Sequence, residues 1–581
     1  MKSALLLLLC FLCGPLWALV SPAPIHHDLE VKLAPQQRTL TVSDQVSLPQ
    51  PMRQLTLQLH AGLNPRFYTE TGEIEVDRFD ADDSGERFRI TLPEGTTRIR
   101  IEYTGTIHEA LSSSRAEQSR GFRSTSGLID ARGVFLAGST LWYPQVSGYS
   151  YLTYSMEVEL PPGWSSVSQG KRESRQSGNE LTRERWVIDK PQEEIYLIAA
   201  QFTEYGRDLQ RPQGSIKAQV FLRQPDQKLA EKYLDATAGY LQMYEQLLGP
   251  YGYSKFALVE NFWETGFGMP SFTLLGSRVI RLPFIINSSY PHEILHNWWG
   301  NGVYVDFASG NWSEGLTAYL ADHLIKEQQG QAVSYRQQSL QKYRDYAAEN
   351  RDFPLSQFRG RHSSSTEAVG YGKTLMLFHM LRKKLGDEVF TRALQTLYRD
   401  YRFRTASFDD VRQVFERVSG EPLKRFFAQW VERTGAPALV LKATRVEQDA
   451  GRYRLTFTLQ QTQSGDPYHL EVPIAVSLKD QRQAKEFVVH MKAREKTVEV
   501  DLPTPPTRVD VDPGFDLFRK LAIEETPPAF TQIFGAKELL VVLPGRAQAD
   551  LQSAWQAFAR DVAHMGPEKV SIVTDGEIES L

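Results

Sequence analysis

Cysteine is nearly absent from this 581-residue chain, and its two copies, Cys10 and Cys13, both lie in the first stretch of the sequence. Disulfides and thiolate metal sites therefore cannot organise the rest of the chain, where a metal site must use His, Asp or Glu. An excess of one charge is also absent, because 66 basic residues stand against 70 acidic ones, a formal net charge of −4. This balance excludes nucleic acid as the expected main partner.

Long hydrophobic runs are confined to the N-terminus. Lys2 precedes an apolar stretch at residues 4–12, and small residues follow around Ala18 and Ser21. This order predicts a signal peptide over residues 1–21. A membrane anchor is the alternative, but the run is shorter than the roughly 20 residues that a spanning helix needs. We therefore expect an exported protein, periplasmic or secreted, with no stable membrane span once the leader is removed.

The remaining chain is long enough for several domains, since single domains rarely exceed roughly 250 to 300 residues. Apolar and polar residues alternate over many segments of residues 22–211, which predicts an antiparallel β-domain. Helical spacing dominates residues 212–435, and alternation returns over residues 436–523, which predicts a β-sandwich. Residues 524–581 begin with a Pro-rich linker and predict a small C-terminal α/β unit. The expected fold class is multidomain α+β.

A possible metal site lies in the helical region. His292 and His296 stand four residues apart, so on a helix expected to be capped by Ser289 both can face one ion. Two ordinary helix histidines are the alternative. A candidate third ligand, Glu314, favours the metal site over this alternative. Ser313 is expected to cap a second helix that begins at Glu314. Two histidines and one glutamate leave a fourth position open for water, as catalytic zinc requires.

Other histidines fit a metal site less well. His323 stands nine positions after Glu314, on the opposite face of the expected helix. His26 and His27 are adjacent strand residues whose side chains point to opposite faces. The metal prediction therefore stays with the two histidines at helical spacing.

The stretch 292–301, with Trp-Ser-Glu-Gly downstream, resembles the gluzincin aminopeptidases of peptidase family M1, the relatives of aminopeptidase N. Further motifs follow the family's order over about residues 25–520, including Tyr371-Gly372-Lys373. The resemblance implies a mostly helical, thermolysin-like catalytic domain over residues 212–435 that acts on a peptide or protein substrate. It also implies one Zn²⁺ per chain, bound by His292, His296 and Glu314.

The resemblance assigns roles to three further residues. Glu293 corresponds to the general base and acid, which takes a proton from the attacking water and passes it to the leaving amine. Tyr371 corresponds to a tyrosine that donates a hydrogen bond to the developing oxyanion, with simple packing as the alternative. Asp322 stands eight positions after Glu314, where the family has an acid at seven, and is a candidate to orient a zinc-bound histidine.

One part of the family pattern is missing. Pro270 stands where the glutamate of G-x-M-E-N would hold the free α-amine of the substrate, so the chain is a divergent member. Gly268 and Met269 remain as candidate substrate-binding residues. Glu260 or Glu264 could supply the missing charge, with a structural or solvated role as the alternative.

Three functions stay open at this point. The first is an exported zinc metallopeptidase of aminopeptidase type, and the second is an endopeptidase or specialised peptidase. The third, from another class, is a zinc- or peptide-binding module without turnover. Glycosylation sequons at Asn287 and Asn311 lie close to the expected ligands, where glycans would crowd the site, so a bacterial envelope is the favoured location.

Overall fold

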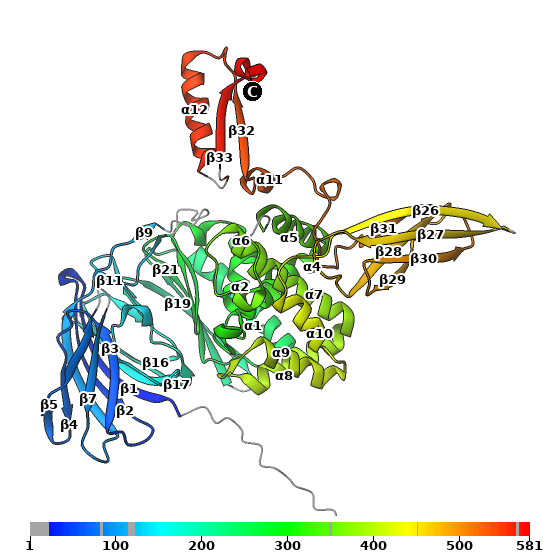
Figure 1. Cartoon of the computed structure of the whole chain (residues 1–581). Coiled ribbons are helices and arrows are strands. Elements are labelled where there is room, and N and C mark those ends of the chain that lie inside the picture. Colours follow the sequence, from blue (N-terminus) through cyan, green and yellow to red (C-terminus); the bar gives the residue numbers. More distant parts are fainter. Residues whose placement is uncertain are drawn as a thin grey trace, which may run out of the picture. The chain divides into compact units, whose positions relative to one another are not determined.

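The computed structural model describes residues 23–580 except 82–84, 114–122, 213, 348–350, 450, 565–566 and 568 (Figure 1). The predicted signal peptide, residues 1–21, lies outside them. The chain divides into two compact units. The first unit comprises Met1–His108, Ile129–Pro162 and Arg172–Leu197. The second comprises Glu109–Leu128, Gly163–Lys171 and Ile198–Leu581.

The first unit is built on an eight-stranded sheet with the order β16-β17-β14-β1-β2-β8-β4-β5. Buried residues alternate with exposed ones along β1 (Ile25–Ala34), as expected of a sheet with one solvated face. The sheet is mixed rather than wholly antiparallel, because β1 pairs in parallel with β14 (Leu152–Leu160). Its other strands are β2 (Thr39–Ser47), β4 (Arg66–Thr69), β5 (Gly72–Ile74), β8 (Arg98–Thr106), β16 (Lys171–Ser177) and β17 (Thr182–Gln192).

A second sheet of the first unit has the order β13-β3-β7-β6. Its strands are β3 (Gln54–His60), β6 (Asp77–Ala81), β7 (Gly85–Thr91) and β13 (Gln145–Val146). The N-terminal half of the chain also contains β9 (Ser112–Ser113), β10 (Arg123–Ser124), β11 (Gly127–Asp130), β12 (Gly133–Leu136), β15 (Ser165–Val167) and β18 (Leu197–Ala200).

The second unit opens with a five-stranded sheet of order β19-β20-β21-β23-β22. Strands β21 (Lys255–Asn261) and β23 (Phe272–Gly276) are parallel to each other and buried along their whole length, as expected of central parallel strands. The edge strand is β22 (Gly266–Met269), which pairs antiparallel with β23. The remaining strands are β19 (Thr203–Arg211) and β20 (Gly214–Leu222).

One helix lies between β20 and β21, and the other helices follow the sheet, within the region where the periodicity predicted them. The first, α1 (Gln227–Leu248), is capped by Asp226, whose side chain accepts the N–H of Leu229. Two short helices then hold the predicted metal ligands: α2 (Ser289–Leu295) and α3 (Trp312–Ala318). The others are α4 (Leu324–Gln328), α5 (Ala332–Tyr346), α6 (Ser364–Glu367), α7 (Thr374–Leu385), α8 (Asp387–Tyr401), α9 (Phe408–Ser419) and α10 (Lys424–Phe427), with the short strands β24 (Tyr304–Val305) and β25 (Thr405–Ala406).

Two three-stranded sheets form the β-rich part that follows, with the orders β26-β27-β30 and β29-β28-β31. Leu455, Phe457 and Leu459 of β27 (Arg452–Gln461) are fully buried, in agreement with their alternation in the sequence. The other strands are β26 (Leu439–Asp449), β28 (Leu470–Leu478), β29 (Lys485–Met491), β30 (Glu495–Leu502) and β31 (Pro506–Val511).

The C-terminal segment contains a β-α-β unit. Its strands β32 (Glu538–Leu543) and β33 (Lys569–Thr574) pair in parallel, and α12 (Ala549–Ala563) connects them. A short helix, α11 (Phe530–Phe534), precedes this unit. Across the part of the chain that the structure describes, no helix is both long enough and apolar enough to cross a membrane.

Candidate metal centre

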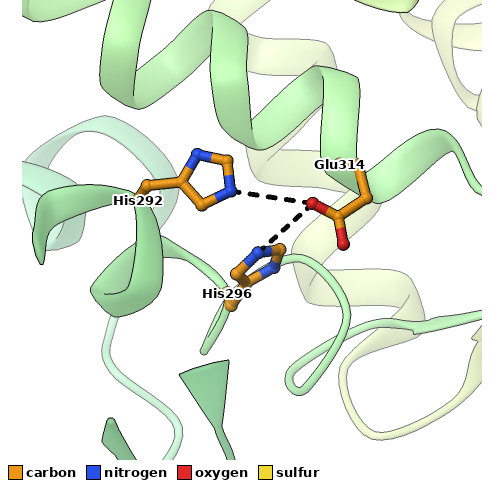
Figure 2. A group of neighbouring side chains, drawn as sticks. All are labelled: His292, His296 and Glu314. Atoms are coloured by element: carbon orange, nitrogen blue, oxygen red, sulfur yellow. Dashed lines mark ion pairs between the residues drawn. The ribbon is translucent and has the colours of Figure 1, made fainter. Parts of the chain in front are cut away.

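Three side chains from two helices converge in the second unit. His292 belongs to α2, His296 follows its last residue, and Glu314 lies in the first turn of α3. Glu314 Oε2 lies 3.6 Å from Nε2 of each histidine, as Figure 2 shows. The ligand atoms of all three residues lie within 4.8 Å of one another. Zinc at its usual distance of roughly 2.0–2.2 Å from such donors separates tetrahedral ligand atoms by about 3.4 Å, so the three side chains fit that ion.

The start of α2 differs from the expectation. Ser289 is the first helical residue rather than the cap, and Ser288 before it turns its hydroxyl to the carbonyl of Phe284. The pairing of the histidines does not depend on that cap. The N–H of His296 donates to the carbonyl of His292 at 3.2 Å, so one helical hydrogen bond holds the two on the same face.

The start of α3 also differs from the expectation. The helix begins two residues before Glu314, and Asn311 is the residue that precedes it. Ser313 lies inside the helix, and its hydroxyl donates to Asn311 Oδ1 at 2.8 Å. Glu314 nevertheless lies in the first turn, where the helix dipole favours a negative charge.

Both histidines direct their second ring nitrogen to an acceptor. His292 Nδ1 lies 2.9 Å from Asp322 Oδ2, and His296 Nδ1 lies 3.0 Å from the carbonyl oxygen of Trp299. A proton on each Nδ1 leaves the lone pair of each Nε2 directed toward Glu314. This is the tautomer that zinc needs, and partners of this kind hold the rings in place.

Asp322 reaches His292 through an irregularity in the second helix. A residue eight positions after Glu314 would lie well off the ligand face of a regular α-helix, whereas seven positions would return to it. Between α3 and α4 the chain makes a π-helical turn over Tyr319–His323. Such a turn absorbs about one extra residue, which brings Asp322 back toward the ligand face.

Glu293 lies beside the ligands rather than among them. A β-carbon added at Gly268 would stand 2.4 Å from Glu293 Oε2 and 3.1 Å from Cδ2 of His296. The edge strand β22 therefore approaches the carboxylate closely, and residue 268 has room only for hydrogen. Asn301 Nδ2 donates to the carbonyl of Gly268 at 3.3 Å and fixes the strand from the other side.

Tyr371 also lies at the ligands. It belongs to a π-helical turn, Ala368–Lys373, between α6 and α7. Its ring is nearly parallel to that of His292, with centroids 6.4 Å apart, and its hydroxyl hydrogen-bonds with the carboxylate of Glu314. Burial, together with the charge of Glu314, raises the pKa of Tyr371 well above 10, so the phenol keeps the proton that it can donate.

The two carboxylates of the site differ in their acidity. Burial by itself would raise the pKa of Glu314, but His296 and His292 lower it to about 2. Burial raises the pKa of Glu293, although both histidines oppose that shift. Glu314 is therefore the stronger acid and binds as an anion, and Glu293 is the better proton acceptor.

The stretch that corresponds to the family's amine-binding glutamate forms a turn in this structure. Pro270 and Ser271 form the two-residue turn between β22 and β23, with Ser271 in the left-handed region at φ 67°. Glu260 is 3% exposed and pairs with Arg281 at 2.7 Å, so its contacts describe a structural role. Glu264 accepts the N–H of Arg278 at 3.1 Å. Glu260 is therefore engaged, whereas Oε2 of Glu264 is buried and has no hydrogen-bond partner among the described residues.

Two contacts of the site could not be predicted from residue types or their spacing. The carbonyl of Trp299 holds His296, and a backbone oxygen leaves no trace in residue type. Asn301 fixes β22, although its spacing from Gly268 has no period that could have indicated the contact.

Comparison with known proteins accounts for this arrangement. Residues 286–430 match the model of the peptidase family M1 domain, a range that includes every ligand together with Glu293 and Tyr371. This part of the chain is similar to the peptidase family M1 domain. The resemblance drawn from the sequence is confirmed, and zinc is the metal that this match and the His-His-Glu cluster indicate.

The curated proteins to which this chain is similar are aminopeptidases, and their sequence identity to it is low. Aminopeptidase M1-D of Oryza sativa subsp. japonica is 25% identical over 279 residues, which is 45% of this chain and 31% of that protein. Aminopeptidase 2, mitochondrial, of Saccharomyces cerevisiae is 22% identical over 344 residues, 54% of this chain and 35% of that protein. Glutamyl aminopeptidase of Sus scrofa is 21% identical over 468 residues, 73% and 48%. The chain thus spans half or less of the length of these relatives.

Solved structures share the fold. The M1 zinc metallopeptidase of Deinococcus radiodurans superposes with a TM-score of 0.56 at 18% identity, over 71% of this chain and 95% of that one. A variant of that enzyme with a Tyr-Ser-Ala substrate bound gives a TM-score of 0.54 over 71% and 94%. The predicted fold class is confirmed by this likeness.

Proposed function

We propose that this chain is a zinc metallopeptidase that hydrolyses peptide bonds, with aminopeptidase-type action as the leading form. The observation that carries the proposal is the set of ligand atoms of His292, His296 and Glu314 within 4.8 Å, with Glu293 beside them. The names of the relatives, aminopeptidase and zinc metallopeptidase, support it.

Each residue of the site has a separate role in the proposed reaction. Zinc bound by the three ligands would polarise the peptide carbonyl and lower the pKa of a coordinated water. Glu293, with its pKa raised by burial, accepts the proton of the attacking water and delivers it to the leaving amine. Tyr371 turns its protonated hydroxyl toward the ligands, where it can donate to the oxygen that gains charge, a contact worth roughly 3 kcal/mol. Asp322 holds the ring of His292.

A second candidate is an endopeptidase or a peptidase for blocked N-termini. The observation that favours it is the turn at Pro270, which has neither the carboxylate nor the N–H of the residue that it replaces. Of the two candidate replacements, Glu260 is engaged by Arg281, and Glu264 accepts the N–H of Arg278. A free α-amine would therefore lose its charged anchor at this turn.

One experiment separates these functions. Zinc content is measured on freshly purified protein, and hydrolysis is measured with a free peptide and its N-acetylated form. Glu293→Gln is the catalytic variant, and Glu327→Gln, on α4, is a control that removes another carboxylate from the same unit. Faster cleavage of the free peptide supports aminopeptidase action, and equal cleavage supports the second candidate. If zinc-replete protein cleaves neither peptide, the binding module without turnover is the function that remains. Protein purified without zinc would contradict the assignment of the metal site.

We also propose that the protein is exported, with the envelope of a bacterium as the favoured destination. The leader-like pattern of residues 1–21 supports this proposal. Asn311 of the second sequon is 5% exposed, which disfavours a glycan at that position. N-terminal sequencing of protein from a bacterial periplasmic fraction tests the proposal. A mature terminus near residue 22 is expected, and an intact leader in the cytosol would contradict it.

A further inference from the structure

A buried lysine lies behind the turn that replaces the amine-binding glutamate. Lys255 is the first residue of β21 and is 2% exposed. Its Nζ donates to Ser271 Oγ at 2.7 Å and to the carbonyl of Ser271 at 3.2 Å. The ammonium also lies 5.3 Å from the ring centroid of Phe272. A lysine is seldom buried so completely, so its contacts with the turn call for a specific role.

The turn residue itself is held from three directions. Ser271 has the left-handed backbone that favours glycine, and it keeps this conformation without being glycine. Its Oγ accepts the N–H of Gly170 at 3.2 Å as well as the ammonium of Lys255. Its own N–H donates to Oδ1 of Asn297 at 2.7 Å. The surrounding side chains thus determine the shape of this turn.

Asn297 connects the turn to the metal-binding helix. It follows His296 directly, and its Nδ2 donates to the carbonyl of Ile294 at 2.9 Å. Tyr251 supports the same amide oxygen at 3.3 Å and also donates to the carbonyl of Lys255 at 2.9 Å. Lysine, turn and metal-binding helix therefore form one buried hydrogen-bonded cluster.

The position of β22 depends on this turn. The strand ends at Met269, immediately before the turn, and its Gly268 approaches Glu293 so closely that a β-carbon would stand 2.4 Å from the carboxylate. A displacement of the turn would change the gap between the strand edge and Glu293. Displacements of about 1 Å at such a place can cost roughly a hundredfold in rate.

We propose that Lys255 is a positioning residue, which acts through Ser271 to set the distance between the edge of β22 and Glu293, and so the placement of a peptide backbone at the metal. The inference rests on the proposed peptidase function and deepens it. Lys255 touches no reacting atom and has no part in proton transfer.

The test compares two inhibitors that both bind zinc. Acetohydroxamate needs only the metal, whereas a peptidyl hydroxamate also needs the strand edge. Lys255→Met keeps the length of the side chain and removes its hydrogen bonds. Lys217→Met is the matched control, because Lys217 pairs with Lys255 across β20 and β21 but is exposed. Zinc content, both inhibition constants and the separate kcat and KM values are measured for each variant.

We expect Lys255→Met to weaken the peptidyl hydroxamate by about tenfold or more, with acetohydroxamate and zinc content changed by less than about twofold. The loss in peptide hydrolysis should appear mainly in KM. Unchanged binding of both inhibitors by the folded variant would overturn the proposal, as would equal weakening of the two.

A second variant covers the case in which Lys255→Met does not fold. Ser271→Ala removes only the hydroxyl contact and should shift the same inhibitor ratio in the same direction by a smaller amount. An unchanged ratio in that variant would overturn the proposal. Wild-type protein that binds both hydroxamates but cleaves no peptide would contradict the proposed function alone, since the inhibitor ratio still reports on Lys255.

Discussion

Each unit of the chain has a histidine–aspartate pair that is made through Nδ1 of the histidine, and the two have nearly equal geometry. In the first unit, His27 Nδ1 lies 2.7 Å from Asp44 Oδ2, and both side chains are fully buried. In the second unit, His292 Nδ1 lies 2.9 Å from Asp322 Oδ2, with side chains 14% and 24% exposed. Only the second pair belongs to a candidate metal site.

The two pairs differ in the surroundings of the second ring nitrogen of the histidine, Nε2. His27 Nε2 is buried and has no hydrogen-bond partner among the described residues, and its ring meets Tyr143 edge-on at 5.6 Å. Nε2 of His292 instead faces Glu314, at the distance that an ion between them requires. A histidine–aspartate pair by itself only orients the imidazole ring. The metal site also needs a second histidine on the same face. His296 provides it four residues after His292, whereas His26 is adjacent to His27 in β1 and points to the opposite face.

The largest effect should come from removing each histidine. His292→Ala should abolish stoichiometric zinc and lower kcat/KM by at least about 10³-fold, because the metal supplies several kcal/mol of transition-state stabilisation. His27→Ala should leave zinc bound and destabilise the first unit by about 3–5 kcal/mol, since it leaves Asp44 buried without its partner. Metal analysis, peptide kinetics and urea unfolding measure the three quantities. Loss of zinc from His27→Ala would contradict the comparison.

Substitution of the two aspartates should separate the two pairs in the same way, with smaller effects on zinc binding and stability than the histidine substitutions have. Asp322→Asn should weaken zinc binding or activity by about 10–100-fold, because it loosens the ring of His292. Asp44→Asn should leave activity unchanged and cost about 1–3 kcal/mol of stability. Zinc competition with a chelator and urea unfolding are the measurements. Wild-type zinc affinity in Asp322→Asn would show that the π-helical turn has no role in the site.

Gly268→Ala probes the gap between β22 and Glu293. The added β-carbon would stand 2.4 Å from Glu293 Oε2, so the carboxylate or the strand must move, and kcat/KM should fall by about 10–100-fold. Gly239→Ala is the matched control, since Gly239 lies in α1 with no atom within 4 Å of an added β-carbon. That control should keep full activity and unfold at slightly higher urea. Equal kinetics for the two variants would argue against contact at Gly268.

The last effect concerns stability alone and a buried histidine, His323, whose partner is a cation. His323 Nε2 accepts from Arg336 Nη1 at 2.9 Å, and burial, followed by His379 and Arg336, lowers the pKa of His323 to about 3. Below pH 6.5, the ordinary pKa of histidine, His323 binds a proton in the unfolded chain but stays neutral in the folded chain until the pH approaches 3. Stability should therefore be lost as the pH falls from 6.5 toward 3, by up to about 1.4 kcal/mol per pH unit. The other charged groups that act on His323 are Arg382 and Asp516.

His323→Gln should flatten this dependence. Urea unfolding at pH 7, 5.5 and 4 gives the slope for the variant and the wild type. An equal slope in both would assign the effect to other groups, and His379, whose pKa burial also lowers, would be the next to test.

Several features were open to prediction because they depend on short-range periodicity. The four-residue spacing of His292 and His296 placed them on one helix face, and the alternation in β27 identified its buried residues. Helix α12 and the strands around it were also recognisable from their patterns. The helix caps were less predictable, since Ser288 and Asn311, rather than the serines after them, precede the two helices.

Other features depend on contacts that sequence patterns do not record. Strand β1 pairs in parallel with β14, more than a hundred residues later, so the first sheet is mixed. Asp322 reaches His292 because a π-helical turn shifts the register of the second helix by about one residue. The contact of Lys255 with Ser271 joins β21 to the turn between β22 and β23, and neither residue type indicates it.

Residue type and helical period were enough to identify the candidate metal ligands and the candidate general base, and to show that no cysteine follows residue 13. The sequence by itself also determined that the amine-binding glutamate is replaced by proline. Only the tertiary structure decided what stands behind that proline: a turn held by a buried lysine and by the helix that carries the ligands. The physical reason is that ligand chemistry resides in single side chains, whereas the position of an edge strand depends on hydrogen bonds between segments that only folding brings together.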